Sequence, residues 1–566
     1  MLGENPLFRY GVIAACLCVG IGGVGAVTAA PAPNSQQRMF DRLQEQERQR
    51  QQQQLEDMQV PGEGPDLRMP VPEGSGASDR CFEIESVQLK TLGDAPLPFG
   101  RWFRRPADAV ERTCIGMKDI RALQAVLSNA LIDKGYVTSR VLIPEQDIAS
   151  GTLVLLVVAG RVESFEAVGM PVRVLEWAVP ASPGDLVNLR DLEHAVETLA
   201  RLPHLDAKMD LAPGEEQGGT VVLGQAEWPR RYRGTLVLDE EHYGDVTHGT
   251  AQAGLDWGSP FGLTDRISLS LNSDLDTEFS DRAWGAGLSY DISLGYWNLA
   301  LSYNRQQYEN EIQGIFQRFE TTGATDTSRI ELTRTLYRSN RSRLSFSLLG
   351  AYSDTENLLD DAVIRVSSYQ LKALGGRINA KHLWGRTQLA GTVTVEEGWG
   401  TGPATNLPGD VSIAEKTHTR YQTYLTANRF IKPLYGALSL RLNAQYANDV
   451  LFPSERFSVA SSSVVRGYRD ITLNGNSAVA GSVQFDGYPP ITGPVSVIPF
   501  AAYDSGVVPG NQNEFGFSRI DSTTAGVRLG YRSVRLTTEI SWPMEQHSTE
   551  LTDSEYTLHA SLYAEF

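Results

Sequence analysis

The chain has 566 residues, a formal net charge of -18 and a mean hydropathy of -0.24. The negative charge argues against nucleic acid as a partner, because binding to a phosphate backbone depends on basic residues. The polar hydropathy does not exclude a membrane β-barrel, because alternate residues of a barrel strand face the lumen and can be polar.

The N-terminal segment has the features of a cleaved secretory signal, which we assign to residues 1–29. Arg9 supplies a positive charge, the run from Tyr10 to Val27 is apolar and uncharged, and small residues surround Ala29. The alternative is one transmembrane helix, but the run is glycine-rich and barely long enough to cross a bilayer. No later window reaches the roughly 18 consecutive apolar residues of a helical span. We therefore expect an exported mature chain that is either soluble or a β-barrel.

Two of the four cysteines lie in the signal segment, which leaves Cys81 and Cys114. An exported chain with two cysteines most simply forms one disulfide, so we predict a bond between them, with free buried thiols as the alternative. The eight histidines are scattered, no group of Cys and His has metal-ligand spacing, and no G-x-x-x-x-G-K-[ST] loop is present. We therefore expect no metal site, no nucleotide site and no cofactor.

Residues 30–60 are polar and rich in Gln, Arg and Glu. A helix over this segment would carry an apolar stripe too thin to join a core. It could lie in a polar channel, or it could be a solvated arm. Residues 61–79 are rich in Pro and Gly, and we expect them to form a linker. The apolar side chains of the polar segment are Met39, Phe40, Leu43, Leu55 and Met58.

Two small α+β modules follow, and we place them at residues 80–160 and 161–228. Each has an extended run, a helical pattern and further extended runs, so the order of elements repeats. Residues 153–158 of the first module are all apolar, which predicts a strand buried on both faces. The helical faces consist of Ile120, Leu123, Leu127 and Leu131 in the first module and Leu192, Val196 and Leu199 in the second.

Residues 229–566 alternate apolar and polar side chains in segment after segment, as in Leu438 to Ala444. Short turns alternate with longer polar loops, which is the asymmetry of an outer-membrane barrel. We predict a transmembrane antiparallel β-barrel of roughly 14–18 strands, an even number because both ends should lie on the same side. A soluble β-sandwich or β-helix is the alternative fold.

The last residues of the chain favour a closed barrel. Apolar side chains occupy alternate positions up to the terminal aromatic residue. A final strand that ends in this way is similar to the assembly signal of outer-membrane barrels. The residues of this face are Leu558, Ala560, Leu562, Ala564 and Phe566.

One long loop of the predicted barrel contains the tetrapeptide Val465-Arg466-Gly467-Tyr468. Glycine permits a backbone turn that other residues resist, and arginine presents a planar guanidinium with five donors. If the loop folds into the lumen, this guanidinium needs a carboxylate, and Asp504 is the candidate. Removal of either partner would cost about 3–5 kcal/mol. The alternative is that the arginine is solvated and the aspartate lies in a turn.

This order of segments resembles the two-partner secretion transporters, the TpsB proteins of the ShlB/FhaC/HecB haemolysin-activator family within the BamA-like superfamily. The resemblance covers essentially the whole mature chain. The tetrapeptide matches the family's V-R-G-Y/F motif of the sixth extracellular loop. Phe500-x-x-x-Asp504-x-Gly506 resembles the inner-wall motif whose aspartate pairs with the arginine, although the spacing of its aromatic residue differs slightly.

The two modules share in the resemblance. The tract from Leu202-Pro203 to Pro213-Gly214, followed by Gly218, is similar to the signature of the second polypeptide-transport-associated (POTRA) domain of the family. The two remaining cysteines lie where many members carry a pair in the first such domain. The resemblance thus implies a plug helix at residues 30–60, POTRA domains at 80–160 and 161–228, and a barrel of about 16 strands at 229–566.

The implied function is transport rather than catalysis. Members of the family export one large partner exoprotein (TpsA), unfolded and N-terminal secretion domain first, across the outer membrane of a Gram-negative bacterium. The POTRA domains then lie in the periplasm, and the other expected partners are outer-membrane lipid and the barrel-assembly machinery. One alternative is a barrel-assembly protein related to BamA or TamA. An outer-membrane enzyme and a passive porin are further alternatives, although no histidine lies in a catalytic motif.

Overall fold

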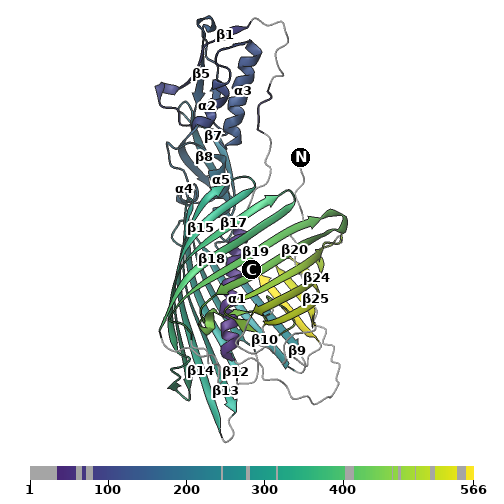
Figure 1. Cartoon of the computed structure of the whole chain (residues 1–566). Helices are drawn as coiled ribbons and strands as arrows, with labels where there is room; N and C mark the ends of the chain where they lie inside the picture. The colour runs from purple at the N-terminus through teal and green to yellow at the C-terminus, as the bar shows by residue number, and fades with distance from the viewer. Residues whose placement is uncertain are drawn as a thin grey trace.

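The computed structural model describes residues 35–58, 67–71, 81–243, 246–275, 281–313, 317–401, 414–461, 463–468, 473–490, 493–509, 517–544 and 556–566. The predicted signal peptide and most of the predicted linker lie outside these residues. Figure 1 shows two small modules stacked at one end of a barrel, with a helix inside the barrel.

The first module is an α+β unit with its helices packed on a three-stranded sheet. Its strands follow the order β2-β5-β4, with β2 parallel and β4 antiparallel to β5. Its elements are β1 (Phe82–Ile84), β2 (Ser86–Thr91), η2 (Leu92–Asp94), α2 (Arg101–Asp108), β3 (Thr113–Ile115), α3 (Met117–Asp133), β4 (Arg140–Leu142), η3 (Ile148–Ser150) and β5 (Thr152–Val158).

The core of the first module lies between α3 and the sheet. Ile120, Leu127 and Leu131 of the predicted helical face are fully buried, and so are Leu153 and Leu155 of β5. The prediction that β5 is buried on both faces is wrong, because its alternate residues are only half-buried. The helices cover one face of this small sheet and leave the other partly open to solvent.

The second module repeats this plan. Its sheet has the order β6-β8-β7, with β6 parallel to β8. Leu192 and Leu199 of the predicted face of α5 are buried in the core, whereas Val196 is half-buried and lies outside it. Helix α5 also has three buried polar residues, which face the barrel: His194, Glu197 and Thr198. The elements are β6 (Arg161–Val168), α4 (Val172–Ala178), α5 (Leu189–Ala200), β7 (Asp206–Pro213) and β8 (Gly219–Glu227).

In the part of the chain that the structure describes, sixteen long antiparallel strands close into a barrel, which confirms the predicted fold. The last strand, β27, pairs with the first, β9, from Thr557 opposite Tyr243 to Glu565 opposite Thr235. The strands are β9 (Tyr232–Tyr243), β10 (Val246–Gly258), β11 (Asp265–Asp274), β12 (Asp281–Leu294), β13 (Trp297–Gln313), β14 (Arg318–Arg338), β15 (Ser342–Leu359), β17 (Tyr369–Trp384), β18 (Thr387–Thr401), β19 (Thr417–Ile431), β20 (Gly436–Ala447), β23 (Ala478–Gly487), β24 (Ser496–Pro509), β25 (Phe517–Tyr531), β26 (Val534–Pro543) and β27 (Thr557–Glu565).

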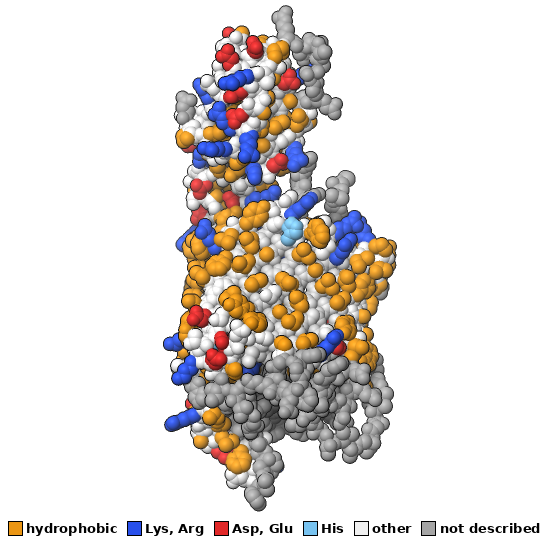
Figure 2. Space-filling model, viewed as in Figure 1, with side chains coloured by type: hydrophobic (Ala, Val, Ile, Leu, Met, Phe, Trp, Pro, Cys, Tyr) orange, Lys and Arg blue, Asp and Glu red, His pale blue; other side chains and the backbone are white. Residues whose placement is uncertain are grey.

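The outer surface of the barrel is apolar and its lumen is polar. Along β18, Val393, Val395 and Trp399 are exposed, whereas Thr394 and Glu396 between them are buried. Figure 2 shows apolar side chains gathered over the outer face of the barrel. Outward apolar and inward polar positions are the arrangement of a barrel surrounded by lipid.

Helix α1 (Ser35–Asp57) runs inside the barrel (Figure 1). Near its beginning, Phe40 packs against Tyr308 of β13, and just beyond its end Met58 packs against Tyr424 of β19. Residues 35–58 therefore lie in a polar channel and are not a solvated arm. Among the described residues, every helix is too short or too polar to span a membrane.

Candidate functional site

The loop that joins β20 to β23 folds back into the barrel, and we call it the inward loop. Its described part contains η5 (Pro453–Glu455), β21 (Phe457–Ser458) and β22 (Asn474–Gly475). Val459, Val464, Val465 and Tyr468 of this loop form a buried apolar cluster with residues of the barrel wall, such as Val508. The tetrapeptide singled out in the sequence thus lies against the inner wall.

Arg466 is held by Asp504 of β24 through a bidentate ion pair. Its Nε donates to Asp504 Oδ2 at 2.7 Å, and its Nη2 donates to Oδ1 at 3.0 Å. Arg466 is 8% exposed and Asp504 is 1% exposed. Two parallel charge-assisted hydrogen bonds in a nearly dry site give both strength and a fixed orientation. The structure therefore brings together the two residues that the sequence paired.

Two further wall residues contact the same guanidinium and were not predicted. Arg466 Nη1 lies 3.4 Å from Gln484 Oε1 of β23 and 3.6 Å from Glu539 Oε2 of β26. One cation thus faces two carboxylates on different strands. Removal of the arginine would take a cationic partner from both carboxylates. We therefore expect its loss to reduce stability more than the loss of either acid.

Gly467 and Tyr468 complete the turn. Gly467 has a φ of +87°, a left-handed conformation that glycine adopts without strain, and its carbonyl accepts from Thr557 Oγ1 at 3.2 Å. The Tyr468 hydroxyl donates to the carbonyl of Asp521 at 2.6 Å and accepts from the amide of Met544 at 3.2 Å. The tetrapeptide therefore contacts strands β24 to β27.

Gly506 allows the loop to approach the wall closely. A Cβ at this position would lie 2.1 Å from Val459 Cγ1 and 2.9 Å from Val465 Cγ2, so any side chain would displace the loop. Phe500 lies on the same inward face of β24, and its ring packs under the Arg528 guanidinium at 4.4 Å. Of the residues predicted around the aspartate, Gly506 thus contacts the inward loop and Phe500 contacts the neighbouring wall.

Phe566 lies at the seam where the barrel closes. Its amide donates to the carbonyl of Gly234 at 3.0 Å, and the Gly234 amide donates back at 2.9 Å. The phenyl ring covers Gly234, where a Cβ would lie 2.3 Å from the ring, and it remains 65% exposed on the outer surface. The terminal aromatic residue is therefore part of the first and last strand pair.

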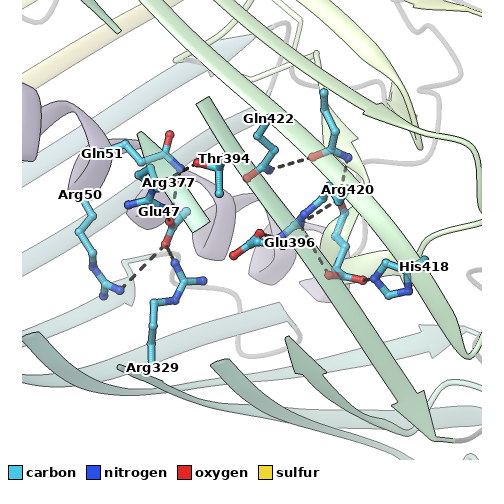
Figure 3. A network of polar contacts seen from close by, with 12 residues as sticks. Glu47, Arg50, Gln51, Arg329, Arg377, Thr394, Glu396, His418, Arg420 and Gln422 are labelled. Carbon is cyan, nitrogen blue, oxygen red and sulfur yellow. Dashed lines mark hydrogen bonds and ion pairs between the residues drawn. The ribbon is translucent and has the colours of Figure 1, made fainter. Parts of the chain in front are cut away.

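The plug helix α1 is anchored to the wall by a set of ion pairs, shown in Figure 3. Glu47 accepts from Arg377 Nη2 of β17 at 3.0 Å and from Arg329 of β14, and Arg50 lies 4.0 Å away on the next turn of the helix. Arg377 is only 1% exposed, and Thr394 Oγ1 accepts from its Nε at 3.1 Å. One carboxylate of the helix thus lies between guanidinium groups of two strands.

A second cluster joins the wall to the base of the inward loop. Arg420 of β19 donates to Glu396 of β18 at 2.5 Å and lies 3.8 Å from Glu455 of the loop (Figure 3). His418 Nε2 lies 2.6 Å from Glu455 Oε2. The inward loop therefore has two charged anchors, one at Arg466 and one at Glu455.

The plug helix and the inward loop also contact each other directly. Gln44 of α1 accepts from the amide of Ser458 at 3.1 Å and donates to the carbonyl of Arg456. A single side-chain amide thus pairs with the loop backbone in both directions. Departure of the helix would leave these two backbone groups without that partner, so the two internal parts are coupled.

Helix α5 fixes the second module to the end of the barrel. Glu197 accepts from Arg338 at 2.5 and 2.7 Å and from Arg343 at 2.8 Å, both arginines lying at the turn between β14 and β15. His194 Nε2 donates to the carbonyl of Gly295 at 2.8 Å. Burial lowers the pKa of His194 to about 3, and nearby Arg343 adds to the effect, so this imidazole is neutral. A cavity of ≈ 500 Å³ lies beside this contact.

The first module carries the disulfide. Cys81 and Cys114 are bonded with their Cα atoms 5.4 Å apart, and the bond joins the start of β1 to β3. Among the described residues, no group of three or more His, Cys, Asp and Glu side chains is arranged to hold a metal ion.

Comparisons with known proteins agree with this architecture. The model of the family "Haemolysin secretion/activation protein ShlB/FhaC/HecB" matches residues 218–533. Two POTRA models, one of them of the ShlB type, match residues 82–160 and 161–213. We therefore call the two modules POTRA1 and POTRA2.

Two relatives with similar sequences are named as an outer membrane transporter and a hemolysin transporter. The outer membrane transporter CdiB of Escherichia coli is 27% identical over 492 residues, which cover 84% of this chain and 80% of CdiB. The hemolysin transporter protein ShlB of Serratia marcescens is 25% identical over 491 residues, which cover 83% of this chain and 84% of ShlB.

A solved structure of CdiB from Escherichia coli has the same fold. It superposes with a TM-score of 0.84 at 21% identity and covers 94% of this chain and 99% of that one. The matched family model spans more than half of the sequence. The chain therefore belongs to the haemolysin secretion/activation protein family ShlB/FhaC/HecB, as its motifs predicted.

Proposed function

We propose that this protein recognises one large partner exoprotein and exports it, unfolded and N-terminal secretion domain first, through its barrel. The protein is an outer-membrane transporter of the two-partner secretion type, with its POTRA domains in the periplasm. In this proposal the domains are the plug helix at residues 30–60, POTRA1 at 80–160, POTRA2 at 161–228 and the barrel at 229–566.

The observation that carries the proposal is a polar channel occupied by two parts, each anchored by ion pairs and hydrogen bonds, to which the inward loop adds an apolar cluster against the wall. The plug helix is anchored through Glu47 and Gln44, and the inward loop through Arg466 and Glu455. Polar contacts of this kind can be exchanged for water or for contacts with a passing chain. Tightly packed apolar contacts would have to be broken without such compensation.

The POTRA domains supply surfaces for capture of an extended chain. Each three-stranded sheet has two edge strands, β2 and β4 in POTRA1 and β6 and β7 in POTRA2. An extended polypeptide can add to such an edge through backbone hydrogen bonds, which tolerate many sequences. No phosphate-binding loop of the G-x-x-x-x-G-K-[ST] type occurs in the sequence, and we propose that folding of the exoprotein outside the cell draws it through.

Two further partners belong to the proposal. The exposed apolar side chains of the barrel, such as Val393 and Trp399, would contact outer-membrane lipid. The barrel-assembly machinery would recognise the last strand, whose terminal Phe566 presents its ring on the outer surface at the seam.

The test of the proposal is the change Arg466→Ala. We expect the barrel to insert normally, judged by its heat-dependent migration on gels, and the amount of partner exoprotein in the culture medium to fall at least tenfold. Arg466→Lys keeps the charge without the planar fork and should restore export only in part.

A matched control is Arg519→Ala. Arg519 also forms an arginine–aspartate pair, with Asp521 at 2.7 Å, but its side chain is 45% exposed. Its loss should leave export unchanged. Wild-type export by Arg466→Ala, or an equal loss with Arg519→Ala, would contradict a specific role for the inward loop.

A further inference from the structure

The described part of the linker, residues 67–71, is attached to helix α3 of POTRA1. The Met69 amide donates to Asn129 Oδ1 at 2.7 Å, and Asn129 Nδ2 donates to the Met69 carbonyl at 2.9 Å. Arg68 Nε donates to Asp133 Oδ1 at 2.9 Å. Two side chains one turn apart on α3 therefore hold two consecutive linker residues.

Both hydrogen bonds of Asn129 to the linker involve backbone atoms of Met69, so they do not depend on the type of residue at that position. One side-chain amide satisfies both the donor and the acceptor of a single residue, as a neighbouring β-strand does in an antiparallel pair. The Met69 side chain remains 41% exposed, so its identity contributes little. Asp133 adds a preference for a basic residue at the preceding position.

The face of α3 that carries this contact is longer than the part the linker uses. Val126, Asn129 and Asp133 lie three and four residues apart and share one side of the helix. Val126 is 40% exposed. A longer extended segment bound to the same two anchors could also cover this apolar position.

We propose that this face of α3 is a binding site for extended polypeptide, that the linker is its resident occupant, and that a segment of the exported exoprotein displaces it. The displacing segment would carry Arg or Lys directly before the residue paired with Asn129. The identity of the displacing chain rests on the proposed function, whereas the site itself does not.

Displacement would act on the plug because the linker is continuous with helix α1. Only residues 59–66 separate Met58, at the plug, from the anchored segment. Occupation of α3 by the exoprotein would release residues 67–71 and remove one restraint on the plug. Competition for one site makes the effect reciprocal, so a docked linker also weakens binding of the exoprotein at α3.

The experiment uses a fluorescent peptide of this chain's residues 65–73 and the full-length protein in detergent, with fluorescence anisotropy as the readout. A tethered segment is present at an effective concentration on the order of mM, so the wild-type linker should exclude the peptide. Met69→Pro removes the linker's own backbone donor and should open the site. We expect the peptide to bind Met69→Pro at least tenfold more tightly than the wild type.

Asn129→Ala added to Met69→Pro should weaken peptide binding at least tenfold, back toward the wild-type value. Asp133→Asn added to Met69→Pro should weaken it to a smaller extent. Arg104→Ala on α2, where Arg104 pairs with Asp108 at 2.8 Å, is the control and should leave peptide binding unchanged. Equal affinity of the peptide for the wild type and for Met69→Pro, or no effect of Asn129→Ala on that affinity, would contradict the proposed binding site.

Hydrogen exchange at the Met69 amide provides a second measurement on the intact protein. The amide should be protected in the wild type and should exchange at least tenfold faster in Asn129→Ala; equal rates would overturn the docked linker. Addition of the partner's secretion domain to the wild type should raise the same exchange rate. Unchanged exchange would overturn the exoprotein as the displacing chain, while export measured with Arg466→Ala would still test the proposed function separately.

Discussion

The change Glu47→Gln should release the plug helix without altering its shape or length. The neutral amide removes the carboxylate that α1 places between Arg329 and Arg377. Loss of one partner from a buried ion pair costs about 3–5 kcal/mol. Glu331 of the wall lies 3.5 Å from Arg377 and still pairs with that arginine in the variant, so we use the lower value of about 3 kcal/mol.

A loss of about 3 kcal/mol shifts the equilibrium between the plugged and unplugged states by roughly 100-fold. Single-channel recording in planar bilayers measures this shift as the fraction of time spent at high conductance. We expect that fraction to rise by about two orders of magnitude in Glu47→Gln, until it saturates at the value of a protein without the helix.

The matched control is Glu45→Gln on the same helix. Glu45 contacts Arg48 at 3.2 Å and Gln49 at 3.2 Å, both within α1. A pair of this kind contributes about 0.2–0.5 kcal/mol, so the open fraction should change by no more than about twofold. Equal open fractions in the two variants would refute the reasoning that Glu47 anchors the plug.

Three other predictions concern the plug and the POTRA domains. Deletion of residues 31–60 should raise the conductance in planar bilayers, and an unchanged conductance would exclude a plug. Replacement of Cys81 and Cys114 by Ser opens a loop with a sequence separation of 33, which should destabilise POTRA1 by about 3–4 kcal/mol in urea unfolding. Because the pKa of His194 falls from 6.5 to about 3 on folding, its neutral form stabilises POTRA2 above pH 6.5. The free energy of unfolding should decline by about 1.4 kcal/mol per pH unit as the pH falls from 6.5 to about 3, and His194→Gln should remove this pH dependence.

The fold could be predicted because its signals are local. Alternation of apolar and polar residues predicted the barrel strands, and apolar residues at helical spacing from Ile120 and from Leu192 predicted the long helices of the two modules. The short helices α2 and α4 were not predicted, since their few apolar residues span too little chain to define a period. The second buried face assigned to β5 was wrong because an apolar run does not show how many faces are covered.

The candidate site could be predicted only where one residue demands a particular partner. A buried guanidinium needs a carboxylate, and Asp504 was chosen for Arg466 as an acid at the end of a strand soon after the loop; the structure pairs the two, with Asp504 inside β24 and not at its end. Glu539 approaches the same guanidinium from another strand and carries no signal of its own. Its position is one of many lumen-facing polar positions in the alternating pattern.

The sequence by itself determined that the chain forms a barrel of strands with one apolar and one polar face, and that Arg466 would require an acid if its loop folded inward, because these follow from the period of each strand and the chemistry of each side chain. Only the tertiary structure decided that helix α1 lies in the channel and that Glu47 meets Arg329 and Arg377, which lie 282 and 330 residues further along the chain. The physical reason is that alternation specifies a face and not an opposite partner. Closure of the sheet and the position of the helix within it select, from many similar lumenal residues, the few that meet.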